Sequence, residues 1–169
     1  MKRASTWGIV LVACVVFGGW LWTRYFTDEA RIRSTLRGLL EDMSFGPGTG
    51  NFSKVAKFQR AIVRFTDDIV ISIDQVIPQA PPITGRDELH TAIQATFAQL
   101  SRCEVKLHDV VVKQVTVAPA GAKAAFTASV TTSWPGVEFT AQEFEVRLRK
   151  NDRGEWLLAQ ITAVRTLKR

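Results

Sequence analysis

The spacing of apolar residues changes once along this chain, near Cys103, and this change restricts the fold more than any other feature. Before Cys103, apolar side chains recur every three or four residues, which predicts helices; after it they alternate, which predicts strands with one buried face. Helices followed by strands with short turns are typical of an α+β domain. We therefore expect a curved antiparallel β-sheet packed on three helices.

The three helices are predicted from their apolar faces and from the residues that can cap them. The caps are Thr27 or Asp28, Asn51 or Ser53, and Thr84 with Asp87 three residues later. The apolar faces are Ile32, Leu36, Leu39, Leu40 and Met43; Val55, Phe58, Ile62 and Phe65; and Leu89, Ile93, Phe97 and Leu100. The second helix also has a basic stripe, which we interpret as a solvated face: Lys54, Lys57, Arg60 and Arg64. A β-branched run at 67–74 predicts the first strand.

The strands after Cys103 contain two expected irregularities. Apolar and charged residues alternate from Phe144 to Leu148, but Phe139 is out of phase with them, so a bulge is expected between Phe139 and Phe144. Residues 151–154 have the composition of a hairpin turn. The last strand then has three large apolar residues that cannot share one alternation, which predicts a second bulge or twist: Trp156, Leu158 and Ile161.

Residues 4–23 form a run of 20 positions without a charged side chain. A helix of this length, at about 1.5 Å per residue, covers the ~30 Å hydrocarbon core of a bilayer. Aromatic residues gather near its two ends, as in the headgroup layer of a membrane: Trp7, Trp20, Trp22 and Tyr25. We therefore expect an N-terminal membrane anchor over 1–27, with one transmembrane helix at about 4–23, and a separate domain over 28–169.

The tetrapeptide Leu-Val-Ala-Cys at 11–14 leaves an alternative open, because it has the form of a bacterial lipoprotein cleavage box that would make Cys14 a lipidated first residue. Cleavage there would leave a short apolar segment before it, Ala4 to Ala13, and a greasy tail after it, where a polar tether is expected. These two features favour an uncleaved anchor.

Basic residues flank the apolar run on both sides, so its orientation depends on which group dominates. Lys2 and Arg3 favour a cytoplasmic N-terminus, whereas Arg24, Arg31, Arg33 and Arg37 favour the opposite orientation. A basic tip followed at once by an apolar run is typical of an export signal, and the later arginines lie along a predicted helix of the domain. We therefore expect a single-pass protein of the inner membrane whose C-terminal domain is periplasmic or extracellular.

Composition excludes several function classes for the domain over 28–169. The whole chain has a net charge of +6, of which three charges belong to Lys2, Arg3 and Arg24, so the domain is only mildly basic and no nucleic-acid partner is expected. One cysteine, Cys103, cannot form a disulfide within the domain, and we interpret it as a packing residue. No spacing of His, Cys or acidic residues predicts a metal site, and no cofactor is expected.

Three stretches, in this order and spacing, resemble the nuclear transport factor 2-like superfamily and its SnoaL-like domains. "RFTDDIVISID" at 64–74 resembles the end of the family's second helix running into its first strand, and "ITGRDELHTAIQATF" at 83–97 resembles the start of its third helix. "RLRKNDRGEWLLAQI" at 147–161 resembles its last hairpin. The resemblance implies a cystatin-like cone, in which a bent sheet closed by helices leaves a pocket, but it implies no single function.

The same resemblance provides the candidate site residues. Likeness to ketosteroid isomerase would place a general base near Asp74, but the tyrosine donor of such sites is missing, since the only tyrosine is Tyr25 at the anchor. Asp109 interrupts the apolar face of its own strand, so it either points into the pocket or is turned outward by a bulge at 109–110. His90 on the third helix is a further candidate. The candidates for the pocket wall are Phe58, Ile62, Phe97, Phe126 and Trp156.

Two functions of different classes follow. The first is a membrane-tethered, non-catalytic module that binds a protein partner, a second copy of itself or a small apolar ligand through its cone or sheet face. Type IV secretion assembly factors have this layout of one helix and one such domain. The second is a SnoaL-like isomerase, cyclase or dehydratase with Asp74 or Asp109 as base. The missing tyrosine favours the first.

Overall fold

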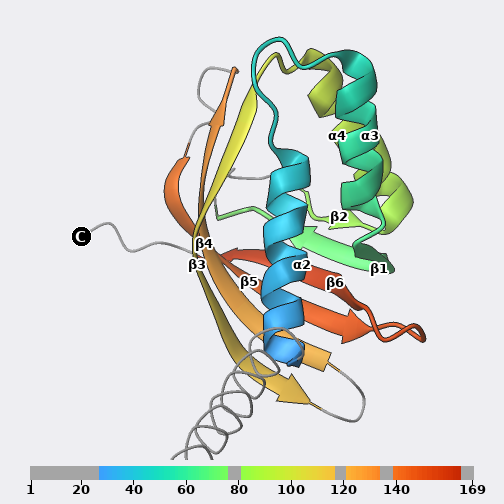
Figure 1. Ribbon diagram of the computed structural model, residues 1–169, viewed down its shortest axis with the longest axis vertical. Coiled ribbons are helices and arrows are strands. Elements are labelled where there is room, and N and C mark those ends of the chain that lie inside the picture. Colours follow the sequence, from blue (N-terminus) through green and yellow to red (C-terminus); the bar gives the residue numbers. More distant parts are fainter. Residues whose placement is uncertain (1–26, 76–80, 117–120, 134–138, 165–169) are drawn as a thin grey trace, which may run out of the picture.

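Three helices lie against the concave face of one strongly curved sheet in the computed structural model, which describes residues 27–75, 81–116, 121–133 and 139–164 (Figure 1). The helices are α2 (Asp28–Met43), α3 (Asn51–Ile62) and α4 (Arg86–Gln99). The strands are β1 (Phe65–Ser72), β2 (Ile83–Thr84), β3 (Cys103–Thr116), β4 (Gly121–Thr132), β5 (Phe139–Lys150) and β6 (Trp156–Val164). The predicted α+β fold with three helices and a curved sheet is therefore confirmed.

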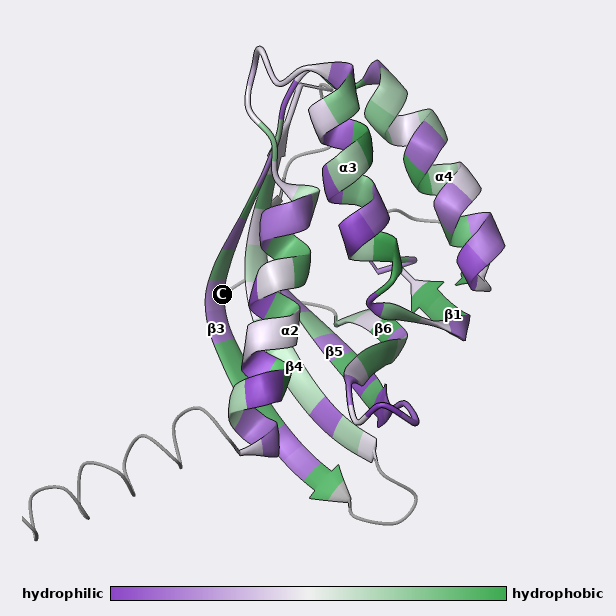
Figure 2. Cartoon of the chain, turned by 45° about the vertical axis from the view of Figure 1, so that its right-hand side comes forward, coloured by the Kyte–Doolittle hydropathy of each residue, from purple (hydrophilic) through white to green (hydrophobic). Residues whose placement is uncertain are grey.

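The sheet is mixed rather than fully antiparallel, which corrects one part of the prediction. Its strand order is β2-β1-β6-β5-β4-β3, and β1 pairs with β6 in parallel while every other pair is antiparallel. After β1 and β2 the chain crosses over through α4 and forms the meander from β3 to β6. The last strand of this meander, β6, lies beside β1 and runs in the same direction. Alternation of polar and apolar residues along the long strands is visible in Figure 2.

The structure confirms one of the three predicted helix caps, and glycine precedes the other two helices. Thr27 caps α2, and its side chain accepts a hydrogen bond from the Ala30 amide at 3.2 Å. Gly50 precedes α3 without a side-chain cap, so neither Asn51 nor Ser53 has that role. Gly85 precedes α4 with a φ of 85°, and Thr84 contacts Glu88 rather than Asp87. A positive φ favours glycine because the residue has no Cβ.

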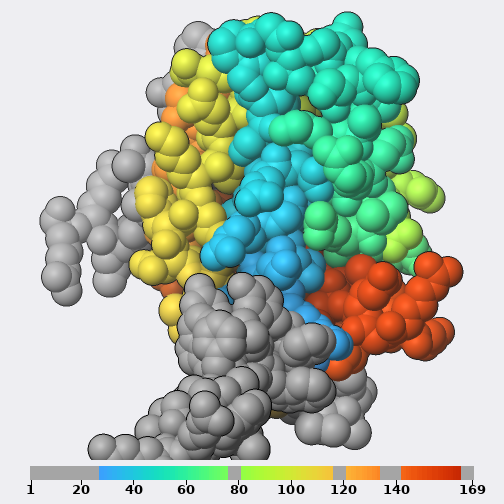
Figure 3. Space-filling model, viewed as in Figure 1, coloured from blue at the N-terminus to red at the C-terminus, as the bar shows by residue number. Residues whose placement is uncertain are grey.

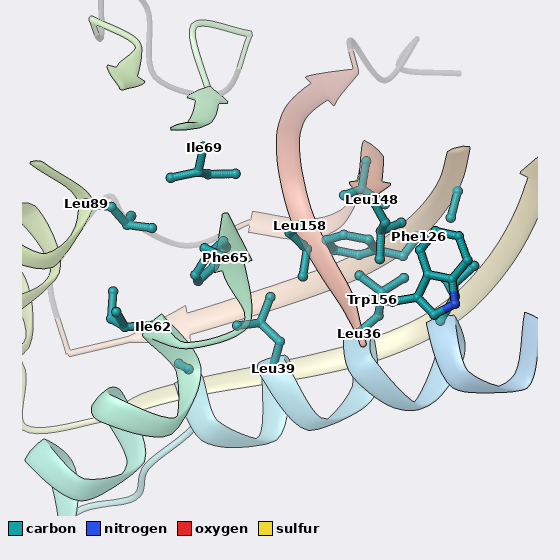
Figure 4. Packing of buried hydrophobic residues seen from close by; sticks show 14 of the residues in the cluster. Leu36, Leu39, Ile62, Phe65, Ile69, Leu89, Phe126, Leu148, Trp156 and Leu158 are labelled. Atoms are coloured by element: carbon teal, nitrogen blue, oxygen red, sulfur yellow. The ribbon is translucent and has the colours of Figure 1, made fainter. Parts of the chain in front are cut away.

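The core lies between α2, the inner side of α3, the start of α4 and the inner face of the sheet (Figure 4). Leu36 and Leu39 of α2 point toward Trp156, Leu158 and the inner side chains of β4 and β5. Ile32 and Leu36 are fully buried, as the helical spacing predicts. Val55 was expected in the core, but it is 53% exposed. Ala61 of the same helix, which was not expected there, is fully buried.

β-Bulges shift the phase of three strands and so decide which side chains face the core. In β5 an extra residue lies between Phe139 and Gln142, which confirms the first predicted bulge. In β6 an extra residue lies between Leu158 and Gln160, so that Trp156 and Leu158 are buried and Ile161 packs against the same core. In β3 the pairing shifts between Leu107 and Asp109. Such insertions turn the following side chains to the other face.

Candidate functional site

The β3 bulge decides the position of Asp109. Pairing shifts at His108, so Asp109 and Val111 point outward and Val110 and Val112 point inward. Asp109 is therefore exposed on the outer face of the sheet, opposite Thr127 of β4. The acid is thus turned away from the pocket, as in the second alternative, but by a bulge at His108 and not at 109–110.

Asp74 also lies at the surface, two residues beyond β1. Its carboxylate accepts hydrogen bonds from the Ser72 hydroxyl at 3.1 Å and from the Gln75 amide at 3.2 Å. Both donors are neighbours in sequence, and the residue is exposed. The Asp74 carboxylate therefore lies in solvent and not in an enclosed pocket that could hold a substrate beside it.

His90 of α4 is half-buried and serves as packing. Its ring lies 5.4 Å from the ring of Phe58, and its Nε2 atom lies 3.4 Å from the Gln94 amide. Within the described residues neither candidate acid contacts this ring, since Asp109 is on the outer face of the sheet and the Asp74 carboxylate is bonded to Ser72 and Gln75. The three candidate catalytic residues are therefore not brought together in the described part of the chain.

The candidates for the pocket wall form core instead. Phe58, Ile62, Phe126 and Trp156 are all buried, and Phe97 packs against the same cluster. Phe58 and Phe97 have ring centroids 5.9 Å apart, and Phe126 stacks on Phe144 at 5.1 Å. These aromatic contacts fill the inside of the curved sheet with side chains.

A groove of about 1130 Å³ lies beside α2, and we call it the arginine groove. Residues 30–37 of α2 form one wall, and the end of α3 with residues 153–157 of the β5–β6 hairpin forms the other. Figure 3 shows this side of the molecule, where α2 (blue), α3 (teal to green) and the hairpin (red) meet. Six arginines line the groove: Arg31, Arg33, Arg37, Arg60, Arg64 and Arg153.

Three of these arginines are held by acids. Arg33 pairs with Glu29 one turn earlier on α2, at 2.6 Å. Asp42 near the end of α2 accepts from both Arg60 at 3.0 Å and Arg64 at 3.1 Å. One carboxylate thus neutralises only part of the charge of two guanidinium groups, and it fastens the end of α3 to α2.

The other three arginines have no carboxylate within 4 Å among the described residues: Arg31, Arg37 and Arg153. All three side chains belong to exposed residues. The hydroxyl residues Ser34 and Thr35 lie on the same wall, and Glu155 is the single acid of the lining. The Glu155 carboxylate accepts a hydrogen bond from the Asn151 amide at 2.8 Å. The arginine groove is therefore a site of concentrated and partly uncompensated positive charge.

Trp156 closes the hairpin end of the groove and is fixed by Asp28. Its indole Nε1 donates to the Asp28 carboxylate at 3.1 Å, and the Lys150 ammonium donates to the same oxygen at 2.8 Å. Lys150 also lies over the Trp156 ring, 5.1 Å from its centroid. The hydrogen bond from Lys150, aided by the one from Trp156, holds the pKa of Asp28 below its ordinary value.

The basic stripe of α3 is less solvated than the sequence predicts, because Lys54, Lys57 and Arg64 are half-buried while Arg60 is exposed. Lys54 donates to the Leu100 carbonyl at 2.9 Å, and Lys57 donates to the Ser44 carbonyl at 2.7 Å. Arg60 and Arg64 contact Asp42. Together these side chains hold α3 to α2 and to the end of α4, because carbonyl and carboxylate groups at helix ends accept such donors.

Sequence reasoning missed the arginine groove because its residues come from three separate segments. In the sequence, Arg31, Arg33 and Arg37 follow the apolar run. Arg60 and Arg64 belong to the basic stripe of the second helix, and Arg153 belongs to a turn. No local signal in the sequence joins these segments, and the feature that they share is seen in the structure: among the 14 lining residues there are six arginines and no lysine. Arginine is favoured where a planar fork must hold carboxylate or phosphate oxygens.

Two further expectations concern Cys103 and metals. Cys103 is buried and free, and burial raises the pKa of its thiol to about 11, so it has the properties of a packing residue. In the described ranges no group of three or more His, Cys, Asp or Glu side chains is arranged to hold a metal ion. The predicted anchor, residues 4–23, lies outside the described residues; within them, no helix is long and apolar enough to cross a bilayer.

Comparison with known proteins supports the fold. No protein-family model matches the chain, and no curated protein matches it. Solved structures do match it, with low sequence identity. A proposed aromatic ring hydroxylase from Novosphingobium aromaticivorans has a TM-score of 0.61 and 15% identity, with 83% of this chain and 90% of that chain covered.

Two further solved structures have no assigned function. A nuclear transport factor 2-like protein from Pseudomonas putida has a TM-score of 0.60 and 14% identity, covering 83% of this chain and 87% of that chain. A protein with a cystatin-like fold from Nostoc punctiforme has a TM-score of 0.57 and 13% identity, covering 83% and 93%. At these identities the matches establish the arrangement of helices and strands and no activity. The described domain therefore has a fold of the cystatin-like, nuclear transport factor 2-like kind.

Proposed function

We propose that this protein is a membrane-tethered, non-catalytic binding module that holds an anionic partner or ligand at the arginine groove. The observation on which the proposal rests is the set of three exposed arginines that have no carboxylate within 4 Å among the described residues: Arg31, Arg37 and Arg153. Guanidinium groups gathered in one groove repel each other, and an anion that fits between them removes this repulsion.

The enzyme alternative has less support. Asp74 and Asp109 are both exposed, and the residues that contact Asp74 are its own sequence neighbours. A general base needs a partner that stabilises the charge developing on the substrate, and the candidates lie apart. A small apolar ligand in the cone is also less favoured, because the candidate wall residues pack against each other as core.

The outer face of the sheet is a second surface where a protein partner or a second copy could bind. Val111 of β3 is 56% exposed on this face. Charged side chains lie near it, such as the pair of Lys113 with Glu145 at 2.6 Å. This exposed valine among charges forms a much smaller apolar area than a stable dimer buries, so this surface is secondary to the arginine groove in the proposal.

The tether part of the proposal places the apolar run 4–23 in the inner membrane and the domain on its periplasmic or extracellular side. Full-length protein should remain in the membrane fraction after a wash at alkaline pH, and a Val12→Lys/Val16→Lys variant should not. Cys14→Ser should leave both attachment and apparent mass unchanged. A shift in mass, or release of the Cys14→Ser protein, would show that Cys14 carries the lipid anchor instead.

Orientation is tested in spheroplasts of the expressing cell. Added protease should digest the domain after Thr23 without lysis, because the proposal places it outside the inner membrane. Protection until the membrane is lysed would mean that Arg24, Arg31, Arg33 and Arg37 determine the topology and that the domain is cytoplasmic.

A further inference from the structure

The six arginines of the groove suggest a narrower class of ligand than a general anion. A guanidinium group offers donors in a rigid planar fork, which matches the oxygens of phosphate and carboxylate groups. The chain contains eight lysines and fourteen arginines, yet the lining of this groove contains arginine alone as its basic residue. A purely electrostatic surface would tolerate either residue, so the groove has the composition of a recognition site.

The unpaired donors approach the groove from two separate elements. Arg31 and Arg37 belong to α2, and Arg153 belongs to the turn between β5 and β6. The hydroxyl groups of Ser34 and Thr35 are further donors on the α2 wall, and no hydrogen bond from them to another described residue is present. A phosphate group has three or four oxygens around one atom, so it can accept from several such donors at once, whereas a carboxylate has two oxygens.

The length of the groove along α2 limits how much of an extended chain it can hold. Its volume is about 1130 Å³, slightly above the ~300–1,000 Å³ of typical small-molecule sites, so a phosphate group would occupy only part of it. Its α2 wall extends from Ala30 to Arg37, which is about 10 Å along a helix axis. An extended acidic peptide would place only about three residues over that length. Val63, which is 63% exposed at the rim, offers an apolar contact for the organic part of such a ligand.

We propose that the arginine groove is a binding site for a phosphate group that Arg31, Arg37 and Arg153 hold between α2 and the β5–β6 turn. This inference rests on the proposed function, since it names the ligand of the same groove. The phosphate belongs either to the headgroup of an anionic phospholipid or to a soluble phosphorylated compound. Both sources present the same oxygens to the same donors.

The position of α2 in the sequence makes the lipid source a concrete expectation. Asp28 begins α2 only five positions after Thr23, the last residue of the predicted span. Five residues extend at most about 17 Å even when fully stretched. The polar layer on each side of a bilayer is itself several ångströms thick. With the anchor as proposed, the chain therefore tethers Arg31 within reach of the headgroups.

The test uses the full chain purified in a neutral, uncharged detergent, with bound species measured by native mass spectrometry and by calorimetry. Four probes are added separately: dioleoyl phosphatidylglycerol, dioleoyl phosphatidylcholine, glycerol 1-phosphate and a tetraglutamate peptide. The groove variant is Arg31→Gln/Arg37→Gln/Arg153→Gln. The matched control is Arg102→Gln/Lys106→Gln/Arg147→Gln, which removes three charges that also have no carboxylate within 4 Å in the described ranges.

Phosphatidylglycerol, glycerol 1-phosphate or both should bind the parent and the control variant equally, and the groove variant at least tenfold more weakly. Binding to the parent and to the control variant should weaken as the concentration of sodium chloride rises, because salt screens exposed charges. If phosphatidylglycerol binds and glycerol 1-phosphate does not, the source of the phosphate is a lipid headgroup. The reverse result identifies a soluble compound. Circular dichroism of the groove variant should match the parent, and the single variant Arg153→Gln provides a milder second measurement.

Four results would overturn the inference. These are equal loss of binding in the control variant, no binding of either phosphate probe, equal binding of phosphatidylcholine and phosphatidylglycerol, and tighter binding of tetraglutamate than of both phosphate probes. The last result would assign the groove to an acidic protein segment. All four leave the tether experiment untouched, so failure of the phosphate site and failure of the membrane anchor are observed separately.

Discussion

The guanidinium group of Arg64 lies against Gly38, near the middle of α2, so closely that a Cβ atom on Gly38 would be only 2.9 Å from the Arg64 Nη2. Glycine inside a helix costs about 1 kcal/mol relative to alanine. The missing side chain leaves room for Arg64 to cross α2 and reach Asp42 at 3.1 Å. Gly38 and Arg64 together therefore fix how α3 ends beside α2 and beside the arginine groove.

Gly38→Ala and Arg64→Ala should consequently not be additive. In the Arg64→Ala background, Gly38→Ala should raise the free energy of unfolding by about 1 kcal/mol, the usual gain in helix propensity. In the parent background the gain should be smaller, because the new methyl group displaces the Arg64 guanidinium from Asp42. Thermal and urea unfolding of the four proteins gives the coupling energy. An equal gain in both backgrounds would show that Arg64 does not use the space above Gly38.

The Asp28 carboxylate should make stability depend on pH in the acid range. Hydrogen bonds from Lys150 and Trp156 hold its pKa below the ordinary value of 3.8. Its contribution is therefore complete above pH 3.8 and is lost as the pH falls through the lower pKa of the folded state. Asp28→Asn should lower the melting temperature at pH 7, and the difference from the parent should shrink below about pH 4.

Asp152→Asn is the control for this experiment. Asp152 is exposed in the β5–β6 turn, and its carboxylate forms no ion pair with another described residue. Its melting temperature should follow that of the parent at every pH. A difference between Asp28→Asn and the parent that stays constant from pH 7 to pH 3 would contradict the proposed role of the charged carboxylate.

Local patterns in the sequence predict most of this fold, because strand phase and helix phase depend on neighbouring residues. The helical spacing of Ile32, Leu36 and Leu39 predicts their burial, and the broken alternation of Trp156, Leu158 and Ile161 predicts the bulge in β6. The parallel pairing of β1 with β6 is a non-local contact. Local alternation is the same in parallel and antiparallel strands, so it could not reveal this pairing.

The candidate site was less predictable for the same reason. Asp109 faces outward because of a bulge one residue earlier, and no turn residue in the sequence marks that bulge. The arginine groove combines residues of α2, the end of α3 and the β5–β6 hairpin, and the lining residues Ala30 and Leu157 are 127 positions apart in the sequence. Such a cluster becomes visible only when packing of the helices on the sheet is known.

Trp156 should contribute to stability through both its ring and its indole N–H. The residue is 3% exposed and lies in the core beside Leu36 and Leu158. Trp156→Ala should cost about 3–5 kcal/mol, because transfer energy is lost and a cavity remains. Trp156→Phe keeps an aromatic ring but removes the donor to Asp28, and it should cost about 1 kcal/mol from the lost hydrogen bond, with a further loss for the smaller ring.

Chemical denaturation of the two Trp156 variants and the parent, measured on the full chain in detergent, distinguishes these contributions. The order of stability should be parent, Trp156→Phe, Trp156→Ala. If Trp156→Ala is as stable as the parent, the indole does not support the core and its place beside the arginine groove would be its main role.

Cys103 should resist modification in the folded protein. Its side chain is buried between Phe45 and Leu100, and burial raises the pKa of its thiol to about 11. The thiolate is the reactive form, so very little of it is present at pH 8, and the reagent also cannot reach the sulfur. In a Cys14→Ser background, where Cys103 is the only thiol, reaction with a disulfide reagent at pH 8 should be slow. It should reach one equivalent rapidly in guanidinium chloride. Rapid modification under native conditions would show that the end of α4 and the start of β3 open readily, and it would contradict the packing role assigned to this residue.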